Sequence, residues 1–282
     1  MGAAGFGLTS AACWGGSDFV GGLGARRAPA LLVVASGHIV SALLLLALCF
    51  GIRVAVPGSS YLLYAAIGGF EGSLALAVFY RALAMGAMGL TAALTGLLTA
   101  LIPVLFSLFY EGLPAPLTAV GLAMGLAAIW LITRLPAAKT PGAGGLRTPP
   151  AALLLGALAG VGFGAQLILF KMASPGGILW TMTSARVAGS AAMLLVLLVI
   201  PPKGRWQGFW LTGIAAGTLD TIGNLFYLRA TQVGRLDVAA LVCSLYPAGT
   251  ILLAAVVLRE RPSRRQMAGI ALALAAVALL SV

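Results

Sequence analysis

Ten long apolar runs, joined by short links, make up nearly all of this chain and limit its possible folds more than any other feature. Of its 282 residues, 61% are hydrophobic and only 8% are charged, whereas about a quarter of the residues in a soluble domain are charged. Lipid must therefore cover most of the surface. Backbone groups in hydrocarbon must pair internally, so only helices or a closed barrel can cross it. Because the runs are continuous rather than alternating, we predict helices.

Each run is close to the roughly 20 residues that a helix needs to span a bilayer. The runs cover residues 3–24, 30–50, 61–84, 88–110, 115–133, 151–171, 177–200, 208–228, 236–258 and 265–282. Pro103, Pro175 and Pro247 are predicted to break or end helices, because proline lacks the backbone N–H that a helix interior uses. The predicted fold class is an all-α membrane protein with ten transmembrane helices arranged as two inverted five-helix repeats.

A Pro/Gly-rich stretch near the middle of the chain divides the ten runs into two sets of five. This stretch, residues 136–149, has the composition of a linker. It separates a predicted first repeat, residues 1–135, from a predicted second repeat, residues 150–282.

The two sets of runs also share sequence. Arg81-Ala82 recurs as Arg229-Ala230 at an offset of 148 residues, and the same offset relates further pairs along the halves. A second copy of a unit with five spans must insert in the opposite sense. Inverted repeats are common in secondary transporters, whose substrate sites lie near the midplane where the repeats meet.

The net charge of +11 does not predict nucleic-acid binding here. Most basic residues fall between apolar runs, where anionic headgroups attract them. Cys13, Cys49 and Cys243 lie in separate runs and form no metal or disulfide pattern. The sequence predicts no cofactor and no metal.

Three short segments resemble signatures of the EamA type of the drug/metabolite transporter superfamily. Residues 14–20, Trp-Gly-Gly-Ser-Asp-Phe-Val, are similar to its Trp-Gly-x-x-Phe signature, and residues 79–83 resemble its Tyr-x-Ala-Leu segment. Residues 258–263 followed by Gly269 resemble its Gly-Glu-Arg segment, of which residues 111–121 are a degraded version. Together with the ten runs and the repeat, the resemblance covers the whole chain.

The resemblance implies a ten-helix bundle whose central cavity is lined mainly by spans 1, 3, 4, 6, 8 and 9. It implies export of amino acids or other small metabolites across the plasma (inner) membrane, with both termini in the cytoplasm. The loop charges point the other way, because Lys and Arg mark the cytoplasmic side. Loops after odd-numbered spans carry Arg26, Arg27, Arg134, Lys139, Arg147, Lys203, Arg205, Arg259, Arg261, Arg264 and Arg265, against Arg53, Lys171, Arg229 and Arg235 after even-numbered spans.

A few ionisable residues lie deep inside the runs, away from their ends, where charge costs a few kcal/mol and usually marks function or pairing. They are Asp18, His38, Glu71, Arg186 and Asp220. One hypothesis is that Glu71 and Asp220 line the cavity and bind a substrate amine or carry a coupling proton. The alternative is that they pair with Arg186 and His38 and only fix helix packing. Asp18 could also reach water near its span's end.

The repeat register groups these residues on the first three spans of each half. His38 and Arg186 are 148 residues apart, as are Asp18 and Gln166. Aromatic rings nearby could form cavity walls and hold a cation, although packing is their usual role. The predicted substrate-binding residues are Trp14, Asp18, Glu71, Tyr80, Gln166, Asp220, Asn224, Tyr227 and Tyr246. The predicted coupling or ion-pair residues are Glu71, Asp220, Arg186 and His38.

The sequence therefore predicts a secondary transporter, with export favoured, of a small polar metabolite such as an amino acid, by alternating access and with protons as a possible coupling ion. An exporter of drugs or organic cations is the nearest alternative. A membrane-embedded enzyme is disfavoured by the lack of paired catalytic motifs, and a channel by the lack of rings of like residues. Glu111 and Glu260, at span ends, are expected to cap helices or pair with Arg259 or Arg261.

Overall fold

The computed structural model describes residues 2–85, 88–133, 149–203, 206, 208–257 and 263–280. Within these ranges the chain forms α-helices and one short 3-10 helix, and no strand. The first half contains α1 (Ala3–Ala25), α2 (Ala30–Gly51), α3 (Ser59–Met85), α4 (Met88–Tyr110) and α5 (Pro116–Thr133). The second half contains α6 (Pro150–Ala173), η1 (Ser174–Gly176), α7 (Ile178–Val199), α8 (Phe209–Val233), α9 (Leu236–Cys243), α10 (Tyr246–Val257) and α11 (Arg264–Leu280). The predicted linker falls almost entirely outside the described residues.

The predicted runs and the observed helices agree within a few residues, with two differences. The run at 208–228 continues as α8 to Val233. The run at 236–258 is divided into α9 and α10 by a turn just before Pro247, where proline suits the first turn of a new helix. Pro175 lies in the 3-10 helix that follows α6. The prediction for Pro103 was wrong, because α4 continues through it.

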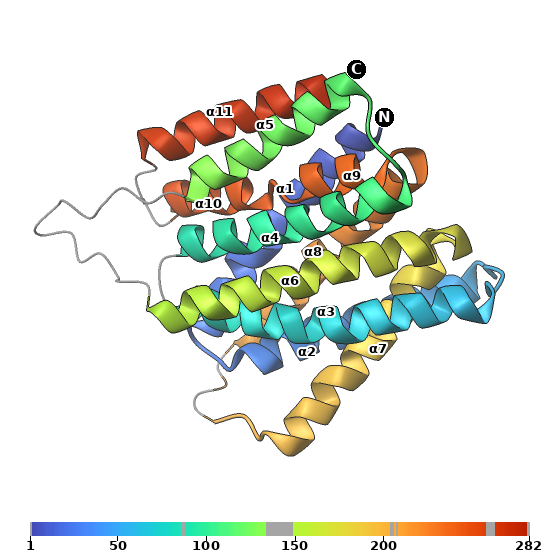
Figure 1. Cartoon of the computed structure of the whole chain (residues 1–282). Helices are drawn as coiled ribbons and strands as arrows, with labels where there is room; N and C mark the ends of the chain where they lie inside the picture. Colours follow the sequence, from blue (N-terminus) through green and yellow to red (C-terminus); the bar gives the residue numbers. More distant parts are fainter. Residues whose placement is uncertain are drawn as a thin grey trace, which may run out of the picture.

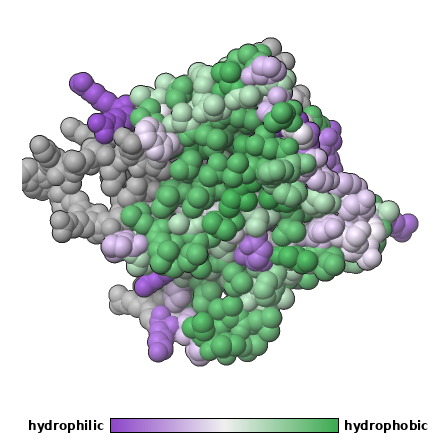
Figure 2. Space-filling model, in the orientation of Figure 1, coloured by the Kyte–Doolittle hydropathy of each residue, from purple (hydrophilic) through white to green (hydrophobic). Residues whose placement is uncertain are grey.

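The outside of the bundle is apolar, as a lipid-facing surface must be. Five stretches are long and apolar enough to cross a membrane: 30–51, 59–85, 150–176, 178–199 and 236–257. Shorter apolar helices lie within α4, α5 and α11. Large side chains such as Leu198, at 79% exposure, and Phe109, at 91%, point outward. Figure 2 shows a hydrophobic belt between more polar ends. This is the surface of a multi-pass membrane protein.

Helices from the two halves interleave. α1 packs mainly on α8, α3 packs on α6 and α7, and α2 packs on α7 and α8. α4 contacts α6, α9 and α10, while α5 and α11 lie side by side at one edge of the bundle (Figure 1). The contacts between halves therefore form the centre of the molecule.

Glycines set the closest of these crossings. A Cβ added at Gly37 of α2 would lie 2.8 Å from the Cα of Gly217 in α8. Gly69 of α3 meets the backbone of Ala185 in α7 in the same way. Small residues let membrane helices approach this closely and gain dispersion energy over a long seam.

Both chain ends lie at the same end of the bundle (Figure 1). We call this the termini end, and the other the loop end. The antiparallel packing of α1 and α8 agrees with this view, because Gly234 approaches Ala3 at the termini end and Gly24 approaches Thr212 at the loop end.

Candidate substrate cavity

A small cavity lies among the central helices. Its volume is about 40 Å³, room for a few water molecules. Its walls come from both halves of the chain. The first half contributes α1, α2, α3 and α4, and the second half contributes α6, α7, α8 and α10. The lining residues are Trp14, Asp18, His38, Gly72, Leu76, Thr99, Phe163, Gln166, Leu167, Arg186, Asp220, Asn224 and Tyr246.

A chain of hydrogen bonds fixes the histidine at this cavity. Arginine only donates hydrogen bonds, so the Nε2 of His38 accepts from the Nη1 of Arg186 at 2.7 Å. The Nδ1 of His38 then carries the ring proton and donates to the Oγ of Ser73 at 2.9 Å. The Ser73 hydroxyl donates in turn to the carbonyl oxygen of Gly69 at 2.5 Å. His38 is therefore held as a neutral imidazole.

The same arginine neutralises one of the cavity's carboxylates. Arg186 is only 3% exposed, and its Nη2 forms an ion pair with the Oδ2 of Asp220. The Nδ2 of Asn224 donates to the other oxygen, Oδ1, at 3.1 Å and to the Asp220 backbone oxygen at 2.8 Å. Asp220 therefore has a partner at each carboxylate oxygen, and helices α2, α7 and α8 are joined through one guanidinium group.

Asp18 lines the same cavity but, unlike Asp220, has no ion-pair partner among the described residues. Its side chain comes from α1, the residue is 6% exposed, and it lines the cavity. Among the described residues, none donates a hydrogen bond or an ion pair to its carboxylate, and the only arginine lining the cavity is engaged with Asp220. Asp18 is thus a buried acid whose charge has no partner within the described chain.

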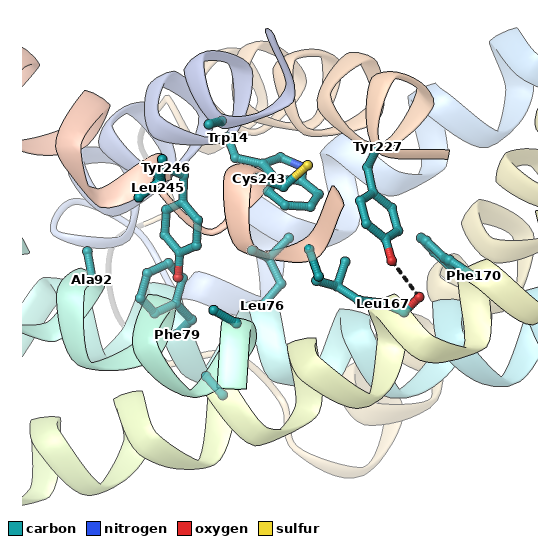
Figure 3. Close-up of a cluster of buried hydrophobic side chains, with 14 of the residues drawn as sticks. Trp14, Leu76, Phe79, Ala92, Leu167, Phe170, Tyr227, Cys243, Leu245 and Tyr246 are labelled. Atoms are coloured by element: carbon teal, nitrogen blue, oxygen red, sulfur yellow. Dashed lines mark hydrogen bonds between the residues drawn. The ribbon is translucent and has the colours of Figure 1, made fainter. Parts of the chain in front are cut away.

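Aromatic rings cluster beside the cavity (Figure 3), and two of them, Trp14 and Tyr246, line it. The Trp14 ring lies between Tyr227, with centroids 6.0 Å apart, and Tyr246, at 6.3 Å and nearly perpendicular. Tyr246 also meets Phe79 edge to face. The Nε1 of Trp14 and the hydroxyl of Tyr246 are buried and have no hydrogen-bond partner among the described residues.

Eight of the eleven predicted site residues line the cavity, and Glu71, Tyr80 and Tyr227 do not. The Tyr80 hydroxyl is bonded to the Ser17 side chain at 3.0 Å and joins α3 to α1. The Tyr227 hydroxyl donates to the Leu167 carbonyl oxygen at 2.7 Å and joins α8 to α6 (Figure 3). Both tyrosines are almost completely buried. In this conformation they hold helices together behind the cavity wall.

Glu71 lies at the seam between α3 and α6. A Cβ added at Gly162 of α6 would lie 3.2 Å from the Oε2 of Glu71, and its Oε1 is buried with no partner among the described residues. Neither Arg186 nor His38 reaches it, because both are bonded elsewhere. Glu71 is only partly buried, whereas the next residue, Gly72, is buried and lines the cavity.

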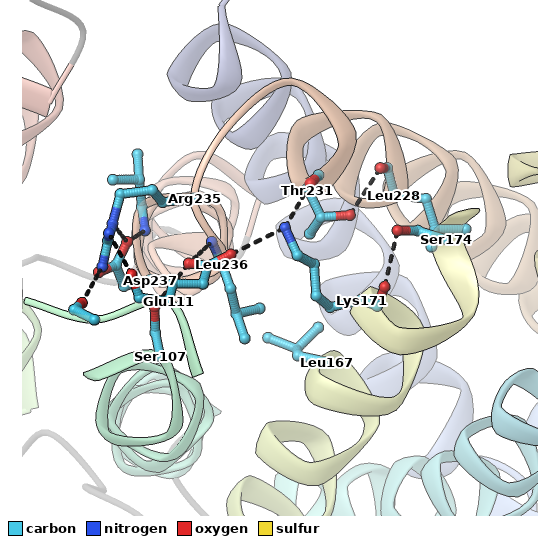
Figure 4. A network of polar contacts seen from close by, with 12 residues as sticks. Ser107, Glu111, Leu167, Lys171, Ser174, Leu228, Thr231, Arg235, Leu236 and Asp237 are labelled. Carbon is cyan, nitrogen blue, oxygen red and sulfur yellow. Dashed lines mark hydrogen bonds and ion pairs between the residues drawn. The ribbon is translucent and has the colours of Figure 1, made fainter. Parts of the chain in front are cut away.

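A second polar network closes the termini end (Figure 4). Glu111, just after α4, forms an ion pair with Lys171 of α6 at 3.1 Å and accepts from the backbone N–H of Leu236 at 2.8 Å, capping α9. Arg235 forms an ion pair with the fully buried Asp237 at 2.9 Å and donates to the backbone oxygen of Gly112. Helices α4, α6 and α9 are thereby tied together.

Glu111 caps a helix, as predicted, and pairing with Arg259 or Arg261 is not tested. Its ion pair is with Lys171, while Arg259, Glu260 and Arg261 lie outside the described residues. Burial alone would raise the pKa of Glu111, but hydrogen bonds from Ser107, Leu236 and Lys171 together outweigh it and hold the pKa below its ordinary value.

Sequence reasoning missed Ser73, Leu76 and Thr99. Ser73 orients His38, and the other two line the cavity. Gly72 and Leu76 are four residues apart, so they share one face of α3 with the cavity. A search for the face of this span that carries small residues would have found the face of Gly72. Glu71 precedes Gly72 by one residue, so its side chain is rotated by about 100° from that face.

Two comparisons with known proteins bear on this site. Residues 150–282 match the EamA-like transporter family. A solved structure described only as "Crystal structure of protein" is similar over 99% of this chain and 98% of its own, with a TM-score of 0.75 and 21% sequence identity. At that identity the likeness shows a shared fold. No curated protein matches the chain.

Proposed function

Because this chain belongs to the EamA-like transporter family of the drug/metabolite transporter superfamily, we propose that it is a secondary carrier of a small polar metabolite. The observation that carries this proposal is the cluster of buried charged residues at a cavity built by both halves of the chain. Charges this deep in a bilayer-spanning bundle are expensive and mark substrate or ion pathways. The family consists of transporters rather than enzymes, which fits the absence of paired catalytic motifs.

The packing supports two inverted repeats. If α6 to α8, α9 with α10, and α11 are second copies of α1 to α5, then the pairing of α1 with α8 corresponds to that of α3 with α6. Likewise the pairing of α2 with α8 corresponds to that of α3 with α7. The glycine crossings agree at the residue level, since Gly37 against Gly217 and Ala185 against Gly69 are related by the offset of 148.

Side-chain contacts follow the same relation. His38 and Arg186 are 148 residues apart and bond directly to each other, as expected for equivalent groups at a two-fold axis. The hydrogen bond between Ser41 and Thr221 corresponds to the close approach of Gly189 to Ser73. These correspondences support an axis that passes through the cavity.

The small cavity supports alternating access. A volume of about 40 Å³ is far below the roughly 300–1,000 Å³ of sites that hold drug-sized ligands. Loading of a metabolite therefore requires the helices to separate. We propose that the bundle opens in turn at the loop end and at the termini end, where the Glu111–Lys171 pair must part.

The cargo and direction rest on the family resemblance. An amino acid or similar metabolite is the proposed substrate class, and export is the proposed direction. Proton coupling would require an acid that titrates during the cycle, and Asp18, Glu71 and Asp220 are the candidates within the spans. The organic-cation alternative is favoured by one specific observation, the unpaired Asp18 beside aromatic rings.

The proposed location is the plasma (inner) membrane. The structure gathers both termini at one end (Figure 1), and the sequence assigns eleven basic residues to loops after odd-numbered spans, which the order of the spans places on the side opposite the termini. Because basic loops face the cytoplasm, we propose that the loop end is cytoplasmic, in opposition to the orientation implied by the family. Protease cleavage of a tag added after residue 282 in intact cells tests this. Cleavage from outside is expected, and protection in intact cells with cleavage in inside-out vesicles would reverse the assignment.

Counterflow in proteoliposomes tests the carrier itself. Vesicles loaded with a mixture of unlabelled amino acids and amines should accumulate at least one radiolabelled member of the mixture, and protein-free vesicles should not. Asp220→Asn should abolish the accumulation in protein that is less stable but still folded, and Glu111→Gln is the control outside the cavity. Glu71→Gln tests the hypothesis that this second acid takes part. No accumulation of any tracer, or a passive current that follows the applied voltage, would contradict a carrier.

A further inference from the structure

Resting on the proposed carrier function, we propose that the cavity selects substrates with a net charge of +1 and binds their ammonium group at Asp18. This narrows the substrate class from polar metabolites in general to small cationic amines. Four steps lead to it: the charge of the cavity, its unused hydrogen-bonding groups, its aromatic wall and the exclusion of other substrate charges.

The charged groups lining the cavity do not balance. Asp18 and Asp220 are acids, Arg186 is a cation, and His38 is neutral because its Nε2 accepts from Arg186. Asp220 is paired with Arg186 and also accepts from Asn224. When Asp18 is ionised, one negative charge remains at the cavity. A buried charge without a partner is strongly unfavourable, so Asp18 favours its protonated form in the absence of a ligand, and a ligand with one positive charge allows it to ionise and completes the site.

The unused acceptors at the cavity suit an amine. The buried Oδ1 of Asn224 has no donor among the described residues, and Asp18, which lines the cavity, receives no side-chain hydrogen bond from them. An ammonium group supplies up to three N–H donors, which matches these acceptors. The Nε1–H of Trp14 and the Nε–H of Arg186 are the converse case, buried donors without an acceptor among the described residues. Hydroxyl or carbonyl oxygens on the substrate would satisfy them.

The aromatic wall suits a cation as well. Trp14 and Tyr246 lie edge to face with centroids 6.3 Å apart, and Phe163 lines the cavity beside them. The faces of such rings attract ammonium groups by about 0.5–2 kcal/mol, more when the cation is desolvated. Asp18 and this wall together provide a negative, apolar environment that favours an amine over a neutral analogue.

Substrates of other charge would leave groups unpaired. An anion would add a second unbalanced negative charge, since both Nη groups of Arg186 are already engaged by Asp220 and His38. A zwitterion has no net charge, so if its ammonium group neutralised Asp18, its carboxylate would have to share the charge of Arg186 with Asp220. Glu71 does not line the cavity and does not change this balance.

Thermal unfolding of the purified protein with matched probes tests the proposal. One probe series is 2-aminoethanol, ethylene glycol, glycolate and glycine, and a second is phenethylamine, phenethyl alcohol, phenylacetate and phenylalanine. We expect a concentration-dependent rise in melting temperature with the amine of at least one series, and no comparable rise with its neutral, anionic or zwitterionic partners. Asp18→Asn, which keeps the shape of the side chain, should weaken the apparent affinity about 10- to 100-fold, the effect of losing a charge-assisted hydrogen bond.

Glu111→Gln is the matched control, because it also removes a carboxylate but lies outside the cavity, and it should keep the amine-dependent shift. The proposal is overturned if neither amine stabilises more than its neutral partner, or if Asp18→Asn responds to the amine as the wild type does. Binding in detergent is independent of transport. Counterflow of a zwitterion without amine binding would therefore contradict the cation site and support the carrier. Amine binding without any counterflow would support the cation site and contradict the carrier.

Discussion

Replacing Arg186 should be the most damaging single change in the membrane interior. Arg186→Met keeps much of the side-chain volume but removes two interactions, the ion pair with Asp220 and the 2.7 Å hydrogen bond to His38. Leaving one partner of a buried ion pair alone costs about 3–5 kcal/mol. The unsatisfied Nε2 of His38 adds about 1–3 kcal/mol. We therefore expect the free energy of unfolding to fall by about 4–8 kcal/mol.

A double-mutant cycle tests the cause of this loss. Asp220→Asn alone should also destabilise, because it leaves the Arg186 charge uncompensated, whereas Arg186→Met combined with Asp220→Asn removes both charges. The double variant should be more stable than the sum of the two single effects predicts, by at least 2 kcal/mol, in reversible unfolding from mixed micelles. Additive effects would show that the pair does not form, and would refute this reasoning about the centre of the bundle.

Three further predictions concern packing, a hydrogen bond between helices, and pH. Gly37→Ala should lower stability by about 1–3 kcal/mol, because its Cβ would lie 2.5 Å from the Gly213 carbonyl oxygen, whereas Gly51→Ala in the same helix meets no atom within 4 Å and should be neutral or stabilising in the same melts. Tyr227→Phe should cost about 0.5–1.5 kcal/mol by removing its bond to the Leu167 carbonyl; an unchanged melting temperature would count against that bond. Because the pKa of Glu111 is lowered in the folded state, its carboxylate stabilises the fold above about pH 4.3, and this contribution disappears as the pH falls through the lowered value. Melts between pH 7 and pH 3 should show a loss in the wild type that Glu111→Gln lacks, and parallel curves would contradict the prediction.

The helices could be predicted from the sequence because hydrocarbon leaves the backbone so few alternatives. Runs of about 20 apolar residues had to be helices, and their ends are close to the observed ones. The division of the ninth run into α9 and α10 was signalled by Pro247. Pro103 also suggested a break, but α4 continues through it. A proline within a membrane helix is tolerated where neighbouring groups satisfy the backbone carbonyl that it leaves free.

The site was predictable to the level of the helix but not of the helix face. The ionisable residues within the spans identified α1, α2, α7 and α8 as walls of the cavity. Glu71 was predicted there too, yet the cavity face of α3 is one residue further along, at Gly72. The rotation of α3 is set by close contacts such as that of Gly69 with Ala185. A composition so rich in small and apolar residues does not reveal which face makes those contacts.

The partners in the ion pairs could not be predicted from the sequence either. Asp220 and Glu71 both had Arg186 as a possible partner in the sequence, and only the three-dimensional arrangement gives Arg186 to Asp220. Lys171 and Glu111 are far apart in the chain and meet only because α4 and α6 end side by side (Figure 4). The unpaired state of Asp18 follows from these pairings, so it too could not be read from the sequence.

Accessibility of the cavity from the two sides of the membrane tests the central claim, alternating access, most directly. Leu76 lines the cavity and is 7% exposed. Leu76→Cys, in a background with Cys13, Cys49 and Cys243 replaced by alanine, can be treated with a membrane-impermeant maleimide in right-side-out and in inside-out vesicles. The account predicts labelling from both sides, slowed in each case by a transported probe. Labelling from one side only, or from neither, would contradict a cavity that opens in turn to the two faces of the membrane.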